Sequence, residues 1–568
     1  MQRILLRTAA IAALFAAAGA AVRAEPNSGA YLAARHAAIF SDYGKAAEYY
    51  RQALAADPGN TALMDDSVTA LVGLGDVDAA AQMARRLAEV GAGSQIGTMV
   101  RIAADAKAGD WAAIRAELDG GATVGPLFDG LVAGWALIGE GDVSEALTKF
   151  DAVAATQGVM AFGLYHKALA LASVGDYEGA DAILSSDENG GLRLTRRGVV
   201  AHAQILSQLD RNPDAVALLD ASFGSDPDAS LAALRARLSA GETVAFEAVR
   251  GAADGVAETL HSIATALNGE ASPSYTILYA RLTEYLRPAH VEATLMTAGL
   301  LEEMERYDLA IAEYRKIPRE DPAFDAAELG RAEALRRSGK VDAAIEVMQQ
   351  LIERNPQSEV FHVQLGDTLR GLDRYAEADT AYSQAVELFD QDQEGQWIVY
   401  FARGIARERL DRWDEAEADF RKALGLNPGQ PQVLNYLGYS YLEKGQNLDE
   451  ALSMIEEAVA ARPDSGYITD SLGWALYRLG RYQEAVAPME KAAELMPVDP
   501  VVNDHLGDVY WAVGRKLEAE FQWKRALSFV PNGDGEADPD RIRRKLEVGL
   551  DRVLSEEGKA PLALAHDG

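Results

Sequence analysis

Small and large apolar residues return along the chain at intervals of about 34 residues. In the stretch that begins at Pro500, small residues stand at Gly507 and Ala519, and large rings stand at Tyr510 and Trp523. Between them, apolar positions recur every three or four residues, which is the period of an amphipathic helix. Each unit is therefore predicted to be two antiparallel helices, because small residues at the eighth and twentieth positions let the two backbones approach closely.

The same unit repeats through most of the chain. Several of the second helices are predicted to end at a proline, such as Pro531, since proline cannot continue a helix. In the N-terminal half the pattern is weaker, but a Gly-Asp pair opens several second helices, where aspartate favours the helix dipole. Predicted units begin at or near Asn27, Thr61, Gln95, Leu127, Ala161, Arg196, Val291, Asp325, Glu359, Trp397, Pro431, Gly466 and Pro500.

These marked positions resemble the tetratricopeptide repeat (TPR). The resemblance implies an all-α fold, a TPR solenoid in which antiparallel helix pairs stack into a right-handed superhelix. We expect a divergent N-terminal TPR array over residues 25–227 and a C-terminal TPR array over residues 291–532. Residues 228–290 are helical in composition but lack the consensus, so we interpret them as a degenerate helical junction.

The two ends of the chain differ from the repeats. Residues 1–24 combine Arg3 and Arg7 with an apolar run and small residues at the end, as in a signal peptide that is cleaved after Ala24. A retained anchor helix is the alternative. Residues 533–568 are predicted to form a capping helix and a disordered tail. The apolar stripe of the cap is expected to consist of Ile542, Leu546, Leu550 and Val553.

Composition narrows the range of partners. The chain has no cysteine, so we expect neither a lipid anchor on cysteine nor a disulfide, and beyond the first 24 residues no segment is predicted to span a membrane. With 54 Lys and Arg against 87 Asp and Glu, the formal charge is −33. Such a surface repels nucleic acid and favours neutral or basic polypeptides. The signal peptide predicts a periplasmic location.

Motifs for catalysis or cofactor binding are missing from the sequence. The eight histidines are at least 29 positions apart, and there is no phosphate-binding loop or serine elbow. His505 follows Asp504, but adjacent helical residues point in different directions, so we expect His505 to line a groove. We predict no enzyme, no metal and no cofactor. A catalytic group within 228–290 is the alternative, although Glu242, Glu247 and Glu258 are expected on solvated helix faces.

The TPR resemblance also implies which side chains face the concave groove. In the last three units these positions hold aromatic, acidic and amide residues, which suit an extended or helical segment with apolar and basic side chains. An alternative is that the rings only pack against the neighbouring unit. The predicted peptide-binding residues are Asn435, Tyr439, Asp470, Trp474, Tyr477, Arg478, Asp504, Asp508 and Trp511.

Three C-terminal strings carry a narrower resemblance. Residues 468–486, 503–527 and 542–550 are similar to the last repeats of periplasmic TPR adaptor proteins of carboxyl-terminal processing proteases. This resemblance implies an exported scaffold that brings such a protease to cell-envelope substrates. The family's lipidated cysteine is missing here. A scaffold for outer-membrane or exopolysaccharide assembly is the alternative, and the sequence leaves the oligomeric state open.

Overall fold

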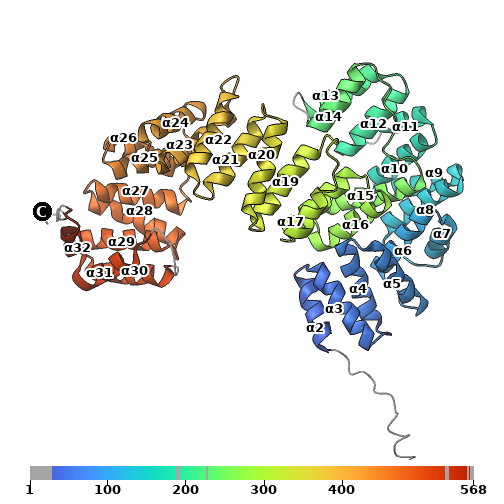
Figure 1. The fold of residues 1–568 in the computed structure, drawn as a ribbon, viewed down its shortest axis with the longest axis horizontal. Helices are drawn as coiled ribbons and strands as arrows, with labels where there is room; N and C mark the ends of the chain where they lie inside the picture. Colours follow the sequence, from blue (N-terminus) through green and yellow to red (C-terminus); the bar gives the residue numbers. More distant parts are fainter. Residues whose placement is uncertain (1–27, 187–191, 225–227, 531–536, 560–561, 563–568) are drawn as a thin grey trace, which may run out of the picture. The chain divides into compact units, whose positions relative to one another are not determined.

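The computed structural model describes residues 28–186, 192–224, 228–530, 537–559 and 562 (Figure 1). The predicted signal peptide and most of the predicted tail lie outside these ranges. Within them the regular structure is helical, with no strand, and no helix is long and apolar enough to cross a membrane. The chain divides into two compact units, Met1–Val347 (unit 1) and Met348–Gly568 (unit 2).

Unit 1 is a succession of short helices, and a longer loop joins α14 to α15. Its helices are α2 (Ser28–Ile39), α3 (Tyr43–Ala56), α4 (Thr61–Leu74), α5 (Val77–Glu89), α6 (Gln95–Ala108), α7 (Trp111–Asp119), α8 (Pro126–Glu140), α9 (Val143–Ala154), α10 (Met160–Ser173), α11 (Tyr177–Leu184), α12 (Arg196–Gln208), α13 (Asn212–Phe223), α14 (Ala229–Ser239), α15 (Ala252–Leu267), α16 (Pro273–Leu286), α17 (Val291–Glu303), α18 (Tyr307–Tyr314) and α19 (Phe324–Arg337). Helix α20 (Val341–Arg354) contains the boundary between the units.

Unit 2 continues with paired helices and ends in two short ones. They are α21 (Glu359–Arg370), α22 (Tyr375–Glu387), the 3-10 turn η2 (Glu394–Gln396), α23 (Trp397–Arg409), α24 (Trp413–Leu426), α25 (Pro431–Lys444), α26 (Leu448–Ala461), α27 (Gly466–Arg478), α28 (Tyr482–Leu495), α29 (Pro500–Ala512), α30 (Lys516–Phe529), α31 (Pro539–Val548) and α32 (Leu550–Glu556). Each predicted repeat begins within one residue of the start of a helix.

The small residues of the repeat explain how the pairs close. Gly404 of α23 faces Phe420 of α24, and a Cβ added at Gly404 would lie 2.6 Å from that ring. At Gly507 of α29 the same atom would overlap the indole of Trp523 in α30. Ala519, at the other crossing position, is fully buried. In these two pairs the first helix has no side chain at the crossing position, which leaves room for a large side chain from the second helix.

In the Gly-Asp pairs of the N-terminal half, the glycine forms the turn and the aspartate caps the next helix by a hydrogen bond, in addition to its effect on the helix dipole. Gly75 has φ 91°, a left-handed conformation that glycine adopts without strain. Asp76 then caps α5, where its carboxylate accepts a hydrogen bond from the backbone N–H of Ala79 at 3.2 Å. The same capping occurs at Asp110, Asp142 and Asp176.

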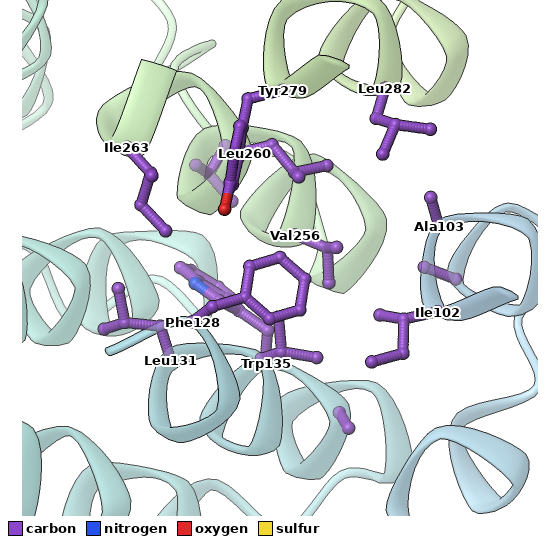
Figure 2. Packing of buried hydrophobic residues seen from close by; sticks show 14 of the residues in the cluster. Ile102, Ala103, Phe128, Leu131, Trp135, Val256, Leu260, Ile263, Tyr279 and Leu282 are labelled. Atoms are coloured by element: carbon purple, nitrogen blue, oxygen red, sulfur yellow. The ribbon is translucent and has the colours of Figure 1, made fainter. Parts of the chain in front are cut away.

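Part of the predicted junction packs onto the N-terminal array itself. The α15–α16 hairpin lies against α4, α6, α8 and α10, the first helices of four successive pairs (Figure 1). Figure 2 shows the core of this contact, in which apolar side chains from the hairpin meet apolar side chains from α6 and α8. Gly255 of α15 lies so close to Trp135 of α8 that an added Cβ would overlap the indole.

Polar contacts tie the same hairpin to the array. Arg281 of α16 is 2% exposed, and its Nε donates to the backbone oxygen of Gly73 in α4 at 3.4 Å. The hydroxyl of Tyr285 donates to Asp78 of α5 at 2.7 Å, and Lys107 of α6 lies 3.6 Å from the centre of the Tyr285 ring. The face formed by α4, α6 and α8 is therefore covered by the chain's own residues.

The predicted capping helix is two helices. Gly549 has φ 82° and separates α31 from α32, which turns the chain back at that point. Ile542, Leu550 and Val553 are buried as the apolar stripe predicts, whereas Leu546 is half-buried. The break has a packing reason, because the indole of Trp511 lies against Gly549 where any side chain would clash.

Candidate peptide-binding groove

A cavity of about 400 Å³ opens in unit 2 along four successive first helices, α23, α25, α27 and α29. We call it the unit 2 groove. Three of the predicted residues line it, namely Asn435, Tyr439 and Asp470. The remaining lining residues are Glu408, Arg409, Tyr436, Ser440, Glu443, Tyr467, Ser471, Met496, Asp499, Val501, Val502 and His505.

Hydroxyl groups organise one wall of the unit 2 groove. The carboxylate of Glu408 accepts hydrogen bonds from Tyr436 Oη at 2.6 Å and from Ser440 Oγ at 2.9 Å. Asn435 is 2% exposed, and its side-chain oxygen is buried without a hydrogen-bond partner. A buried amide oxygen in this state is poised to accept a donor from a bound molecule.

His505 is paired with an aspartate one repeat earlier, and its neighbour Asp504 is turned elsewhere. Its Nδ1 lies 3.0 Å from Asp470 Oδ2. The imidazole also stacks on the Trp474 indole with ring centres 3.9 Å apart. Burial alone lowers the pKa of His505, but the carboxylate of Asp470 outweighs burial and raises that pKa above its ordinary value.

Trp474, Tyr477 and Arg478 form a cluster beside the groove. Trp474 stacks on Tyr477 as well as on His505, with the two ring planes 14° apart in the Tyr477 pair. Arg478 donates to Glu443 at 2.6 Å, and Trp474 Nε1 donates to the same carboxylate at 3.4 Å. The contacts of Trp474 thus match the alternative interpretation, in which the rings pack against the neighbouring unit.

The last three predicted residues contact the C-terminal cap. Lys545 of α31 is fully buried and donates to Asp504 at 2.8 Å and to Asp508 at 2.6 Å. Asp508 also accepts from Trp523 Nε1 at 2.9 Å. The indole nitrogen of Trp511 donates to Asp551 of α32 at 2.9 Å. These three side chains are engaged by α31 and α32, and the cavity does not include them.

The acidic residues named for the catalytic alternative lie in two different environments. Glu242 and Glu247 are exposed as expected, but they lie in the loop between α14 and α15 and not on helix faces. The expectation for Glu258 is wrong, because this residue is 1% exposed and accepts hydrogen bonds from Arg197 and Tyr165. The sequence pattern did not reveal this contact, since its partners come from distant helices. Among the described residues, no group of three or more His, Asp or Glu side chains could hold a metal ion.

Comparison with known proteins identifies the repeats. Family models described as tetratricopeptide repeat match residues 38–100 and residues 295–359, 363–431 and 435–500. These segments are tetratricopeptide repeats. With the paired helices above, the match confirms the predicted all-α TPR solenoid. Repeats of this kind bind protein partners on extended surfaces.

Relatives of the repeats are found in several organisms. The chain is 26% identical over 197 residues to a TPR repeat-containing protein of Pseudomonas aeruginosa. The aligned segment covers 34% of this chain and 32% of that protein. It is 29% identical over 126 residues to the chloroplastic TPR domain-containing protein PYG7 of Arabidopsis thaliana. This aligned segment covers 22% of this chain and 42% of that protein. The chain thus spans less than half the length of these relatives.

A solved structure is similar over a longer range. A chain in the crystal structure of the APC/C hetero-tetramer Cut9-Hcn1 covers 91% of this chain and 95% of its own length. The identity is 14% and the TM-score is 0.37.

Proposed function

We propose that this protein is an exported TPR scaffold that holds a polypeptide segment in the unit 2 groove. The observation that carries the proposal is the cavity along α23, α25, α27 and α29, whose wall includes the unpaired amide oxygen of Asn435. A backbone N–H of a bound segment would satisfy that oxygen. In unit 1 the face along α4, α6 and α8 is covered by the α15–α16 hairpin, so this face is not free to hold a segment.

The charges of the unit 2 groove select the kind of segment. Four carboxylates line it, of which Glu443 is paired with Arg478 and Asp470 is paired with His505. Apolar contact area comes from Tyr439, Tyr467 and Met496. A segment that carries a lysine or arginine near an apolar side chain fits both features, because the cation offsets the acidic wall while the apolar group leaves water.

The partner class follows from the narrower resemblance. The strings at 468–486 and 503–527 supply α27 and α29, two of the four helices that line the groove. We infer that the protein acts in the periplasm, after cleavage following Ala24, and presents envelope substrates to a carboxyl-terminal processing protease. N-terminal sequencing of the mature protein tests the location, with Glu25 expected as the first residue.

Affinity capture from a periplasmic extract tests the groove. The bait is the mature chain, either unchanged or with Tyr439→Ala and Glu443→Lys together, which remove a ring and reverse a charge at the groove. The control is Glu456→Lys, an equal change of charge at an exposed site on α26. We expect the unchanged bait and the control to recover the protease, and the double variant to recover at least about tenfold less.

Two other results have clear meanings. Equal recovery by the double variant and by the control rejects the groove as the binding site. Capture of outer-membrane or polysaccharide-assembly complexes in place of a protease rejects the adaptor role and favours the alternative scaffold.

A further inference from the structure

A second cavity, in unit 1, has the construction of a small-molecule site. It has a volume of about 420 Å³ and opens between α10, α12, α15 and α17. Its walls are mainly apolar and include Phe162, Leu194 and Met296. This volume lies in the range of pockets that bind small organic molecules. The cavity is separate from the unit 2 groove and independent of the proposed function.

The charged groups at the inner end of the cavity are already paired with one another. Arg197 Nε donates to Glu258 at 2.7 Å, and its Nη1 lies 3.3 Å from Glu292. The hydroxyl of Tyr165 donates to Glu258 at 2.9 Å. Burial alone raises the pKa of Glu258, but Arg197 outweighs burial and keeps that pKa below its ordinary value. Arg197 therefore forms a charged pair with Glu258, and its single positive charge is shared with a second carboxylate, Glu292.

His261 is the polar group at this end that lacks a partner. It lines the cavity, is 6% exposed, and its Nδ1 is buried without a hydrogen-bond partner. Its ring lies 4.5 Å from that of His290, and burial lowers the pKa of His261. At neutral pH the ring is therefore an uncharged imidazole, which offers one donor and one acceptor. Ser262, on the next position of α15, also lines the cavity.

We propose that this cavity binds a small uncharged molecule with an apolar body and one hydroxyl or amide group that hydrogen-bonds to His261. The apolar walls would remove the body of the molecule from water. An anion is disfavoured because it would meet Glu258 and Glu292, while the guanidinium of Arg197 is already used by both. Of the cations at the mouth, Arg196 is paired with Asp228, and Arg193 is exposed.

Three naphthalene compounds test the proposal on the full mature chain. Fluorescence titration compares 2-naphthol, which is neutral with one hydroxyl, with naphthalene, which has no polar group, and 2-naphthoate, which is an anion. We expect 2-naphthol to bind most tightly. Naphthalene should bind about 3- to 10-fold more weakly, which is the usual effect of one hydrogen bond. The anion 2-naphthoate should bind more weakly than 2-naphthol.

Variants locate the binding. His261→Phe should weaken 2-naphthol about 3- to 10-fold and leave naphthalene unchanged, whereas His36→Phe, on exposed α2, should change neither. Ala266→Trp fills the cavity from the exposed side of α15 and should abolish both. Circular dichroism checks that each variant is folded.

Several results would overturn the proposal. They are the failure of 2-naphthol to bind, unchanged binding of 2-naphthol in the Ala266→Trp or His261→Phe variant, equal affinity for naphthalene and 2-naphthol, and tighter binding of 2-naphthoate than of 2-naphthol.

Discussion

Single residues set the spacing of each helix pair. Gly507 is the position where α29 meets Trp523, and the absence of a side chain at Gly507 makes room for the indole. Gly425, near the end of α24, is also helical, but a Cβ added there has nothing within 4 Å. The two glycines have different roles, because the first is required by packing and the second is not.

Alanine substitution separates these roles. Gly507→Ala should lower the free energy of unfolding of unit 2 by about 1–3 kcal/mol, since the added methyl group overlaps Trp523. Gly425→Ala should be neutral or stabilising by up to about 1 kcal/mol, because alanine favours helix. Urea denaturation followed by circular dichroism measures both. Equal effects would show that close approach at the eighth position does not determine the pairing.

His505 gives unit 2 a dependence on pH. Its pKa in the folded protein is raised above the ordinary 6.5 by Asp470. Protonated His505 therefore stabilises the folded state fully below about pH 6.5, and this contribution is lost as pH rises through the folded pKa. Removing the imidazole should abolish the dependence.

The comparison variant is His505→Gln. The unchanged protein should be more stable than this variant by about 1–2 kcal/mol at pH 5.5, and the difference should shrink at pH 8.5. Equilibrium unfolding at the two pH values measures this difference. A difference that grows with pH would contradict the assigned pairing with Asp470.

At the scale of elements, α31 closes the array with a buried cation. Lys545 forms ion pairs with both Asp504 and Asp508, which lie on the first helix of the last repeat. Burial and the nearby Asp508 raise the pKa of Asp504. The terminal repeat is thus covered by a charged contact as well as by the apolar stripe of the cap.

Loss of this cation should uncouple the cap. Lys545→Met should destabilise unit 2 by about 3 kcal/mol at pH 7, because two buried carboxylates lose their partner. The loss should be smaller at pH 4, because the raised pKa of Asp504 lets this carboxyl group protonate there. Lys524→Met removes an exposed lysine and should change stability by less than about 0.5 kcal/mol. Thermal unfolding measures both, and similar losses would refute a special role for Lys545.

The α15–α16 hairpin is a second element whose role can be measured. Leu260 of α15 is fully buried in the core of unit 1, whereas Leu32 of α2 is exposed. Leu260→Ala should cost about 2–5 kcal/mol and speed proteolysis of unit 1. Leu32→Ala should stay within about 0.5 kcal/mol. If Leu260→Ala left unit 1 as stable as Leu32→Ala does, the hairpin would be a removable cover.

At the scale of the whole molecule, the sequence predicted the features that repeat. The small residues of the first helices follow from packing within one pair, as where Gly404 lies against Phe420. Because the same packing returns in later pairs, the small residues return at a regular spacing in the sequence. The covering of the N-terminal array does not recur. Arg281 bonds to Gly73 across 208 residues, and no periodicity encodes such a contact.

The candidate site was predicted in part for the same reason. Positions that face the groove follow from the repeat, and Asn435 and Asp470 line the cavity. Asp470 and His505 lie 35 residues apart, one more than the repeat period, so a comparison of equivalent positions does not reveal this pair. The engagement of Asp508 depends on Lys545, which lies outside the repeats.

Photo-crosslinking in intact cells tests the central claim, that a polypeptide binds in the unit 2 groove. A photoreactive phenylalanine analogue replaces Tyr439 in the groove or, as a control, Glu456 on the exposed side of α26. Mass spectrometry then identifies the attached chains. We expect a restricted set of polypeptides at position 439, with a periplasmic protease among them, and few or none at position 456. The same set at both positions, or none at position 439, would contradict the account.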